Sequence, residues 1–381
     1  MKKRKKPAIL NFGHILLGCR FDVWIRLLIE NHFHISPAYI PQAILITCLS
    51  LLLFPFALIE RLILAIPIHK QKPKQPLFIL GHWRSGTTFL QNLLSKDPDH
   101  GFFDPVNTIT INNAWLLKPI LTPLIKKQLP TARPMDNMVY QLDLPMEEVY
   151  ALANTCTLSF LHLLTFPENV QRYLDATFVE SLPQKDRRRW ERAYKYLIKK
   201  QTFICKGKPL ILKSPSNTAI AAELYHLYPD ACFLHIHRDP YEVIVSTIYT
   251  LQKILDTMAL QNDHKEQLLE DLTLTLFTDI FTQLFKDMEK IPPEQFMEIS
   301  YEEFEKQPLE YLEKIYAKFH LSGFEKAKPR FKQYLDGQKN YKKNHLRISP
   351  ALVERINKQL GFYFTRYGYE MKDPNTFSQE V

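Results

Sequence analysis

The stretch Phe78-Ile79-Leu80-Gly81-His82-Trp83-Arg84-Ser85-Gly86-Thr87-Thr88-Phe89-Leu90 decides the fold class of this chain. An apolar run, a short loop with two glycines and a second apolar run predict a buried strand, a tight turn and a helix. Gly81 and Gly86 have the spacing of the glycines in the phosphate-binding motif G-x-x-x-x-G-K-[ST]. Thr87, however, stands where that motif has lysine, and the positive charge lies before the second glycine, at Arg84.

The missing lysine distinguishes two kinds of bound anion. In a nucleoside-triphosphate site, the lysine contacts the outer phosphates and the following hydroxyl binds magnesium. Without the lysine, the loop N–H groups and the helix N-terminus still attract an anion. The hydroxyls of Ser85, Thr87 and Thr88 and the guanidinium of Arg84 add donors. Such a set suits a phosphosulfate; the alternative is that the glycines only form a strand-to-helix turn.

A second strand-to-helix segment is Cys232-Phe233-Leu234-His235-Ile236-His237-Arg238-Asp239-Pro240. Asp239 is a good N-cap and Pro240 a good first helical residue. Ser246 lies two turns further on the same helix face, so Arg238 and Ser246 can converge on one anion. The alternative is that Arg238 is an ordinary surface ion-pair partner.

Together the two segments resemble the sulfotransferase family, whose donor is 3′-phosphoadenosine 5′-phosphosulfate (PAPS). The resemblance implies a 5′-phosphosulfate loop at Arg84, Ser85, Gly86, Thr87 and Thr88, and a 3′-phosphate site at Arg238 and Ser246. It also implies that a basic run at residues 341–344 closes over the 3′-phosphate. Further similarity to the large bacterial branch of the family spans most of residues 8–372, with matching stretches at residues 133–137, 142–152, 212–217 and 341–344.

Alternating strand and helix patterns predict an α/β fold, a P-loop-like three-layer sandwich with a central parallel sheet plus an N-terminal hydrophobic helical segment. We expect residues 71–381 to form the sulfotransferase domain and residues 1–70 the basic, membrane-associated N-terminal part. Arg84, Lys213 and Arg238 each follow a predicted strand, at the sheet edge where such folds bind ligands. Strands are expected at residues 77–80, 210–212, 233–236 and 296–299, and helices at residues 186–200, 219–227, 263–288 and 309–319.

Sulfuryl transfer requires positive charge against the departing phosphate and a base for the acceptor proton. We expect Arg84 and Lys213 to supply the charge. For Lys213, the resemblance implies the role of the family's lysine at the bridging oxygen or sulfonate. Pro215 stands where the cytosolic small-molecule sulfotransferases have a histidine, so that base does not carry over.

Three carboxylates are candidates for the base, with Glu147 first, Glu148 second and Asp104 third. Adjacent carboxylates raise one another's proton affinity, which suits a base. The alternative is that Glu147 and Glu148 only stabilise a helix N-terminus. Weaker candidates are His162, in an apolar run typical of a core histidine, and His82, next to the loop.

The composition is that of a globular protein of 381 residues with a net charge of +9. This charge suits an anionic nucleotide donor or an anionic membrane surface. We expect no nucleic-acid partner and no metal, because no zinc spacing or RNA-binding signature is present. The five scattered cysteines favour buried free thiols. The basic run from Lys185 to Arg192 is interpreted as a solvated helix face.

The N-terminal part is expected to contact a membrane. A basic cluster, Lys2 to Lys6, precedes an amphipathic helix from Arg20 to Glu30, and residues 35–59 carry no charge. That length makes a transmembrane candidate, although Pro55 and the charges at Glu60 and Arg61 weaken a simple span. A single span, an in-plane or re-entrant segment and a buried core helix stay open. A single span would export the catalytic part, so we favour attachment on the cytoplasmic face, where PAPS is made.

Three functions compete at this point. The first is a membrane-associated, PAPS-dependent transferase that acts on a hydroxyl or amine acceptor, such as a lipid or glycolipid, and releases the nucleotide PAP without a metal. The second is a P-loop nucleotide or lipid kinase, which requires magnesium and a lysine after Gly86. The third is a non-catalytic anion-binding protein on the same scaffold. The acceptor and the oligomeric state have no signature in the sequence.

Overall fold

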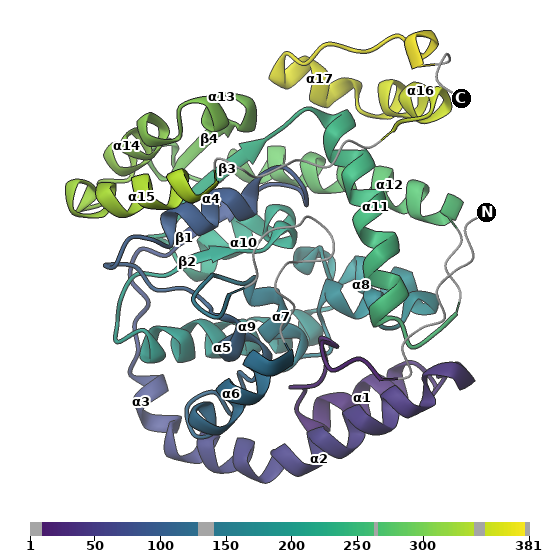
Figure 1. Cartoon of the computed structure of the whole chain (residues 1–381), viewed down its shortest axis with the longest axis vertical. Coiled ribbons are helices and arrows are strands. Elements are labelled where there is room, and N and C mark those ends of the chain that lie inside the picture. Colours follow the sequence, from purple (N-terminus) through teal and green to yellow (C-terminus); the bar gives the residue numbers. More distant parts are fainter. Residues whose placement is uncertain (1–9, 129–140, 263–265, 339–346, 378–381) are drawn as a thin grey trace. The chain divides into compact units, whose positions relative to one another are not determined.

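The computed structural model describes residues 10–128, 141–262, 266–338 and 347–377 (Figure 1). These form two compact units: Met1–Lys74, His100–Leu212 and Lys253–His264 in the first, and Gln75–Asp99, Lys213–Gln252 and Lys265–Val381 in the second. The cluster Lys2 to Lys6 and the stretches at residues 133–137 and 341–344 lie outside the described residues, so the expected closure over the 3′-phosphate does too. The functional division near residue 70 stays a prediction.

The central sheet is parallel, with strand order β2-β1-β3-β4 (Figure 1). In the second unit, β1 (Leu77–Leu80) pairs with β3 (Cys232–His237), and β3 pairs with β4 (Phe296–Ser300). β2 (Ile211–Lys213) is an edge strand. Every residue of β1 and most of β3 are buried, as expected for a parallel sheet that is covered on both faces. The predicted α/β sandwich and its four strands are confirmed.

Each strand of the second unit passes into a helix at its carboxyl end. α4 (Thr87–Leu94) follows β1, α11 (Pro240–Met258) follows β3, and α13 (Tyr301–Lys306) follows β4. Residues 219–227 are not one helix as predicted, because a 3-10 segment precedes the α-helix. The remaining elements are η5 (Pro215–Ile220), α10 (Ala221–Leu227), α12 (Glu266–Met288), η6 (Pro293–Gln295), α14 (Pro308–Lys318), α15 (Phe324–Gln338), α16 (Pro350–Gln359), α17 (Gly361–Tyr367) and η7 (Pro374–Phe377).

Aromatic packing joins the C-terminal helices to the rest of the second unit. Tyr363 of α17 contacts Phe277 and Phe281 of α12 edge to face, with ring centroids 5.0 and 4.7 Å apart. Such pairs add about 0.5–1.5 kcal/mol beyond their buried area. α12 also packs against η5, α10 and α16. The C-terminal helices α16 and α17 therefore belong to the core of the second unit.

Apart from Ile211 and Leu212 of β2, the regular elements of the first unit are helical within the described residues. On α9 (Gln184–Ile204), the buried side chains include Trp190, Tyr194 and Leu197, as the periodicity predicts. Cys19 and Cys156 are buried free thiols, like Cys232 in the second unit, whereas Cys48 is exposed. The helices are α1 (Phe21–Glu30), α2 (Ile40–Ile63), α3 (Ala65–His69), α5 (Pro105–Ile109), α6 (Lys118–Gln128), α7 (Glu148–Ala153), α8 (Val170–Asp175) and α9 (Gln184–Ile204), with 3-10 turns η1 (Pro37–Tyr39), η2 (Phe160–Leu164), η3 (Pro167–Asn169) and η4 (Val179–Ser181).

α2 is the one helix of the described residues that is long and apolar enough to cross a membrane, judged by length and composition. It runs through Pro55 without a break. Only 22% of its most apolar window is buried, at a mean hydropathy of 2.3. A core helix would bury these side chains, so α2 presents an apolar face. The exposed apolar residues include Ile44, Leu51, Leu52, Phe56, Leu58, Ile59, Leu62 and Ile63.

The end of α2 is fixed by a buried ion pair. Glu60 pairs with Lys200 of α9, and both side chains are fully buried. The second carboxylate oxygen of Glu60 accepts hydrogen bonds from the backbone N–H groups of Trp115 and Leu116, at 3.1 and 2.7 Å. Glu60 is therefore an anchor of α2, and its charge points away from the apolar face.

Candidate active site

The loop after β1 begins at a position that only glycine fills. Gly81 has φ 144°, and a Cβ there would lie 2.6 Å from the carbonyl oxygen of Ile236. The N–H of Gly81 donates to Thr218 Oγ1 at 2.8 Å, and the Thr218 hydroxyl lies 3.2 Å from the Gly81 carbonyl oxygen. Thr218 of η5 thus holds both polar groups of Gly81, a role that the sequence does not indicate.

The middle of the loop is a tight turn. Arg84 adopts φ 72°, which is uncommon for a residue with a side chain. Both the N–H and the hydroxyl of Ser85 donate to the carbonyl of His82, at 3.2 and 2.8 Å. The Ser85 hydroxyl, predicted to bind the anion, therefore braces the turn in this conformation. Its contact with a donor stays a prediction.

Gly86 lets the loop pass an aromatic ring. It is the N-cap of α4 with φ 96°, and a Cβ there would lie 2.2 Å from Cδ2 of Tyr301. Tyr301 is the first residue of α13, directly after β4. The sequence pattern explains Gly86 by the phosphate-binding motif alone. It does not predict that the ring of Tyr301 also requires a glycine at this position.

The two predicted basic segments meet in the second unit. Arg84 Nε donates to Ser246 Oγ at 2.9 Å, and Arg238 Nη1 donates to the Arg84 carbonyl oxygen at 3.0 Å. The Arg238 guanidinium also lies over the ring of Tyr301, 4.5 Å from its centroid. Arg84, Arg238 and Ser246 therefore form one cluster beside the carboxyl ends of β1 and β3.

A surface ion pair alone does not explain Arg238. Its distance to Glu242 is 3.5 Å, and the glutamate side chain is 58% exposed, so this pair contributes little. Asp239 caps α11 as predicted, since its carboxylate accepts the N–H of Tyr241 at 2.8 Å. The N–H of Asp239 in turn donates to Glu302 at 2.9 Å. Burial disfavours the charge of Glu302, but such hydrogen bonds outweigh it and lower its pKa.

Lys213, the last residue of β2, contacts the helix that follows the loop. Its side chain is almost fully buried, and Nζ donates to Thr88 Oγ1 at 3.4 Å. Thr88 is in the first turn of α4, next to the buried Thr87. The cationic group predicted from the end of β2 thus contacts the helix N-terminus that follows the loop.

Residues from the C-terminal helices support the Arg238 backbone. The Tyr363 hydroxyl donates to the Arg238 carbonyl oxygen at 3.2 Å. His237 stacks on Tyr367 with centroids 4.0 Å apart, and its Nδ1 lies 2.9 Å from the Tyr369 hydroxyl. Burial lowers the pKa of His237 to about 4, so this ring is neutral near pH 7. The sequence gives no signal for these partners, which lie far from β3 along the chain.

The predicted bases belong to the first unit, whereas the loop and the arginine cluster belong to the second. Glu147 is the N-cap residue of α7 and is half-buried. Glu148, the next residue, is 1% exposed and accepts a hydrogen bond from the Tyr194 hydroxyl at 3.3 Å. Both lie at a helix N-terminus, the position that also suits a purely stabilising acid.

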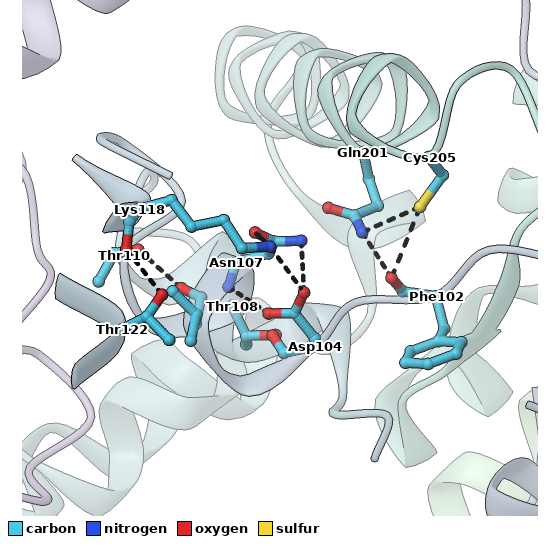
Figure 2. Close-up of polar contacts among 10 residues, drawn as sticks. Phe102, Asp104, Asn107, Thr108, Thr110, Lys118, Thr122, Gln201 and Cys205 are labelled. Atoms are coloured by element: carbon cyan, nitrogen blue, oxygen red, sulfur yellow. Dashed lines mark hydrogen bonds and ion pairs between the residues drawn. The ribbon is translucent and has the colours of Figure 1, made fainter. Parts of the chain in front are cut away.

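Asp104 has a local structural role (Figure 2). Its carboxylate caps α5 by accepting the N–H of Asn107 at 2.7 Å, and it accepts the side-chain amide of the same residue at 2.8 Å. Lys118 Nζ lies 3.2 Å from Oδ2, the oxygen that also accepts the Asn107 side-chain amide. In the same view, Gln201 and Cys205 contact the carbonyl of Phe102. These contacts account for an aspartate at this position without catalysis.

The two weaker candidates are buried histidines. His162 Nε2 lies 3.0 Å from the Cys156 carbonyl oxygen, and His82 packs against Phe277 at 4.9 Å between centroids. Burial lowers the pKa of both rings to about 4. A core role therefore explains both residues.

Known proteins are similar to this chain in sequence or in fold. The chain is 28% identical over 359 residues to two proteins named omega-hydroxy-beta-dihydromenaquinone-9 sulfotransferase Stf3, from Mycobacterium bovis and Mycobacterium tuberculosis, with 94% of this chain and 92% of each relative covered. The fold is similar to the crystal structure of sulfotransferase STF1 from M. tuberculosis, with TM-score 0.62, 16% identity and 85% and 88% coverage. It is also similar to STF9 from Mycobacterium avium, with TM-score 0.61, 17% identity and 93% and 98% coverage.

A family model described as the sulfotransferase family matches residues 76–326. This match covers more than half of the chain and includes the loop after β1, Lys213, and the segment with Arg238 and Ser246. The chain is therefore a member of the sulfotransferase family, and a transferase.

Proposed function

We propose that this protein transfers a sulfuryl group from PAPS to the hydroxyl group of a membrane lipid. The observation that carries the proposal is the cluster of Arg84, Arg238 and Ser246, in which the Arg238 guanidinium donates to the Arg84 backbone carbonyl and the Arg84 guanidinium donates to Ser246. This places positive charge at a loop that has threonine where a triphosphate site has lysine.

The chemistry of the donor set fits PAPS. In this proposal, the N-terminus of α4, with Thr87, Thr88 and Arg84, holds the 5′-phosphosulfate, and Ser85 and Gly86 shape the loop around it. Arg238 and Ser246 hold the 3′-phosphate. Guanidinium groups suit this task because their planar fork matches phosphate oxygens in pairs.

The proposed reaction is an in-line displacement at sulfur. The acceptor oxygen forms a bond to sulfur while the bond from sulfur to the bridging phosphate oxygen breaks, and PAP leaves with the bonding electrons. Lys213 and Arg84 neutralise the charge that develops on the bridging oxygen and the sulfuryl group. The protein supplies this charge itself, so we expect no metal requirement.

The acceptor proton goes to a carboxylate in this proposal. We retain Glu147 as the first candidate because its side chain is half-exposed, and Glu148 as the second because it is buried against Tyr194. Asp104 stays third, since Asn107 and Lys118 already occupy its oxygens. Glu147→Gln is expected to lower kcat while leaving PAP affinity unchanged, with Asp104→Asn as the comparison.

The proposed acceptor is a lipid alcohol of the hydroxylated quinone class. Two observations support this choice: the activity for which the two mycobacterial relatives are named, and the exposed apolar face of α2. We propose that α2 lies in the plane of the cytoplasmic membrane surface rather than across it, because Glu60 anchors its end to α9. Retention in membranes after carbonate and release by detergent would support membrane attachment.

The decisive experiment is incubation of the detergent-purified protein with labelled PAPS and a hydroxylated menaquinone, followed by mass analysis for the gain of one SO₃ group. Parallel titrations with PAP, ATP and magnesium-ATP test the donor. Tight PAP binding and turnover in the presence of EDTA are expected. Magnesium-dependent ATP binding would instead favour the kinase alternative, and PAP binding without turnover on any lipid extract would favour the non-catalytic one.

A further inference from the structure

An arginine-rich cavity lies in the first unit, separate in the sequence from every predicted donor-site residue. Its volume is about 320 Å³, at the lower end of the range for small-ligand sites. It is lined by α1, the last turn of α2, α9 and residues 155–157. The described lining residues include one carboxylate, Asp22, and five arginines: Arg20, Arg26, Arg61, Arg189 and Arg192.

Most of the positive charge in this cavity is not neutralised by the protein. Arg20 forms a forked pair with Asp22, and Arg189 lies 3.7 Å from Asp186. For Arg26, Arg61 and Arg192, no carboxylate of the described residues lies within ion-pair distance. All three side chains are exposed, so water screens their mutual repulsion, and the excess of positive charge at the cavity favours binding of an anion.

The fold holds these arginines in place. Arg61 follows the buried anchor Glu60, and its guanidinium lies 5.6 Å from the ring centroid of Tyr196. Tyr196 and Arg192 are on the same face of α9 as the buried Lys200. Arg189 Nη2 donates to Thr157 Oγ1 at 3.0 Å. Packing and hydrogen bonding therefore hold Arg61 and Arg189 at the cavity, and Arg26, Arg61 and Arg192 remain exposed to solvent at its edge.

The apolar face of α2 continues up to this cavity. Arg61 is flanked in its helix by Leu58 and Leu62, whose exposed fractions are 44% and 77%. On α1, Arg26 stands one turn before Ile29, which is 56% exposed. Arginines at the border of an exposed apolar face are typical of helices that lie in the membrane interface and contact anionic lipid.

We propose that the cavity binds the phosphate group of an anionic phospholipid. Guanidinium forks match phosphate oxygens in pairs, and the adjacent apolar face gives the acyl chains a place beside the cavity. Within the run Lys185 to Arg192, predicted to be a solvated helix face, Arg189 and Arg192 line the cavity, and Arg188 is exposed outside its lining. The inference rests on the proposed membrane contact of α2 but not on sulfuryl transfer.

The test is sedimentation of the full chain with vesicles of phosphatidylcholine alone or mixed with phosphatidylglycerol. Arg26→Ala/Arg192→Ala is expected to weaken binding to the mixed vesicles by about 30-fold, because each lost cation near an anionic surface costs about fivefold. The control Arg188→Ala/Lys195→Ala removes the same charge from exposed positions of α9 and should cost less than about threefold. Equal losses in the two double variants would overturn the proposal.

A second experiment, with a soluble ligand, distinguishes binding in the cavity from binding to the membrane surface. Calorimetric titration with short-chain dihexanoyl-phosphatidylglycerol, below its micelle concentration, is expected to show one saturable site that Arg26→Ala/Arg192→Ala abolishes. Equally tight binding of glycerol 3-phosphate would overturn the lipid assignment while retaining a phosphate site, and binding of neither ligand would overturn both. Arg26→Lys/Arg192→Lys keeps the two charges but removes the forked guanidinium groups, so its affinity is expected to lie between those of the wild type and the alanine variant. This variant tests the proposal even if the alanine variant misfolds.

Discussion

Arg238 donates a hydrogen bond from its guanidinium to the backbone carbonyl of Arg84 at 3.0 Å. This contact joins the end of β3 to the loop after β1, at the loop residue whose φ is 72°. The Arg84 side chain turns to Ser246 of α11, which again follows β3. The proposed 3′-phosphate residues thus help to hold the conformation of the proposed 5′-phosphosulfate loop.

Arg238→Ala is therefore expected to weaken PAP binding by about 10- to 100-fold, since hydrogen bonds to charged groups contribute about 1.5–3 kcal/mol. Calorimetric titration with PAP measures the loss. Arg355→Ala, which removes a surface arginine paired with Glu270 and Asp271 in the same unit, is the control and should bind PAP as the wild type does.

Adenosine 5′-phosphosulfate, which lacks the 3′-phosphate, separates the two roles of Arg238. If Arg238 only contacts the 3′-phosphate, the variant binds this ligand as well as the wild type does. Because Arg238 also holds Arg84, we expect a smaller but measurable loss. An unchanged affinity for PAP would contradict the assignment of the 3′-phosphate site.

Gly86→Ala is expected to lower PAP affinity more than tenfold and to destabilise the protein by about 1–3 kcal/mol. The added Cβ would lie 2.2 Å from the Tyr301 ring, and the residue would keep a φ of 96°. Titration with PAP and urea unfolding measure the two effects.

Gly207→Ala is the matched control for this change. Gly207 also has a positive φ, 80°, but a Cβ there meets nothing within 4 Å. It should therefore show the backbone strain without the loss of PAP affinity. Similar PAP affinity in the two variants would exclude the Tyr301 contact as the cause.

Local patterns made the strands, the loop and the capped helix after β3 predictable. The Asp239 cap and the position of Ser246 depend on residues that are close in sequence, so helix geometry alone fixes them. The course of α2 was less predictable, because tertiary contacts such as the Glu60–Lys200 pair stabilise a helix that contains Pro55.

Contacts between distant segments could not be predicted in the same way. Tyr301 lies against Gly86, and Tyr363 holds the Arg238 backbone, yet neither tyrosine has a local signature. One weak signal existed, since Tyr301 directly follows the predicted fourth strand, at the edge where ligands bind. Such contacts can be identified only from the three-dimensional structure, in which the strand order brings the two segments together.

Buried histidines predict a loss of stability in mild acid. Burial lowers the pKa of each from 6.5 to about 4, so the unfolded chain takes up protons that the folded protein excludes. Stability is therefore full above about pH 6.5 and falls as the pH decreases to about 4, by about 1.4 kcal/mol per pH unit for each group. The histidines concerned are His14, His82, His162 and His237.

Urea unfolding between pH 6.5 and 5 measures this slope. In His162→Phe, the slope should decrease by about one proton, although the lost contact with the Cys156 carbonyl lowers stability at every pH. His226→Gln, at an exposed position, is the control variant. The same slope in His162→Phe and wild type would show that His162 does not contribute.

The buried pair of Glu60 and Lys200 predicts strong non-additivity. Glu60→Leu leaves the Lys200 charge buried and two backbone N–H groups without their acceptor, so a loss of about 3–5 kcal/mol in the free energy of unfolding is expected. Lys200→Met should cost a similar amount by leaving Glu60 uncompensated. The double variant should lose well under the sum of the two losses in the free energy of unfolding, because it leaves no buried charge. Urea unfolding of all four proteins in detergent measures this double-mutant cycle. Additive losses would mean that the two charges do not interact.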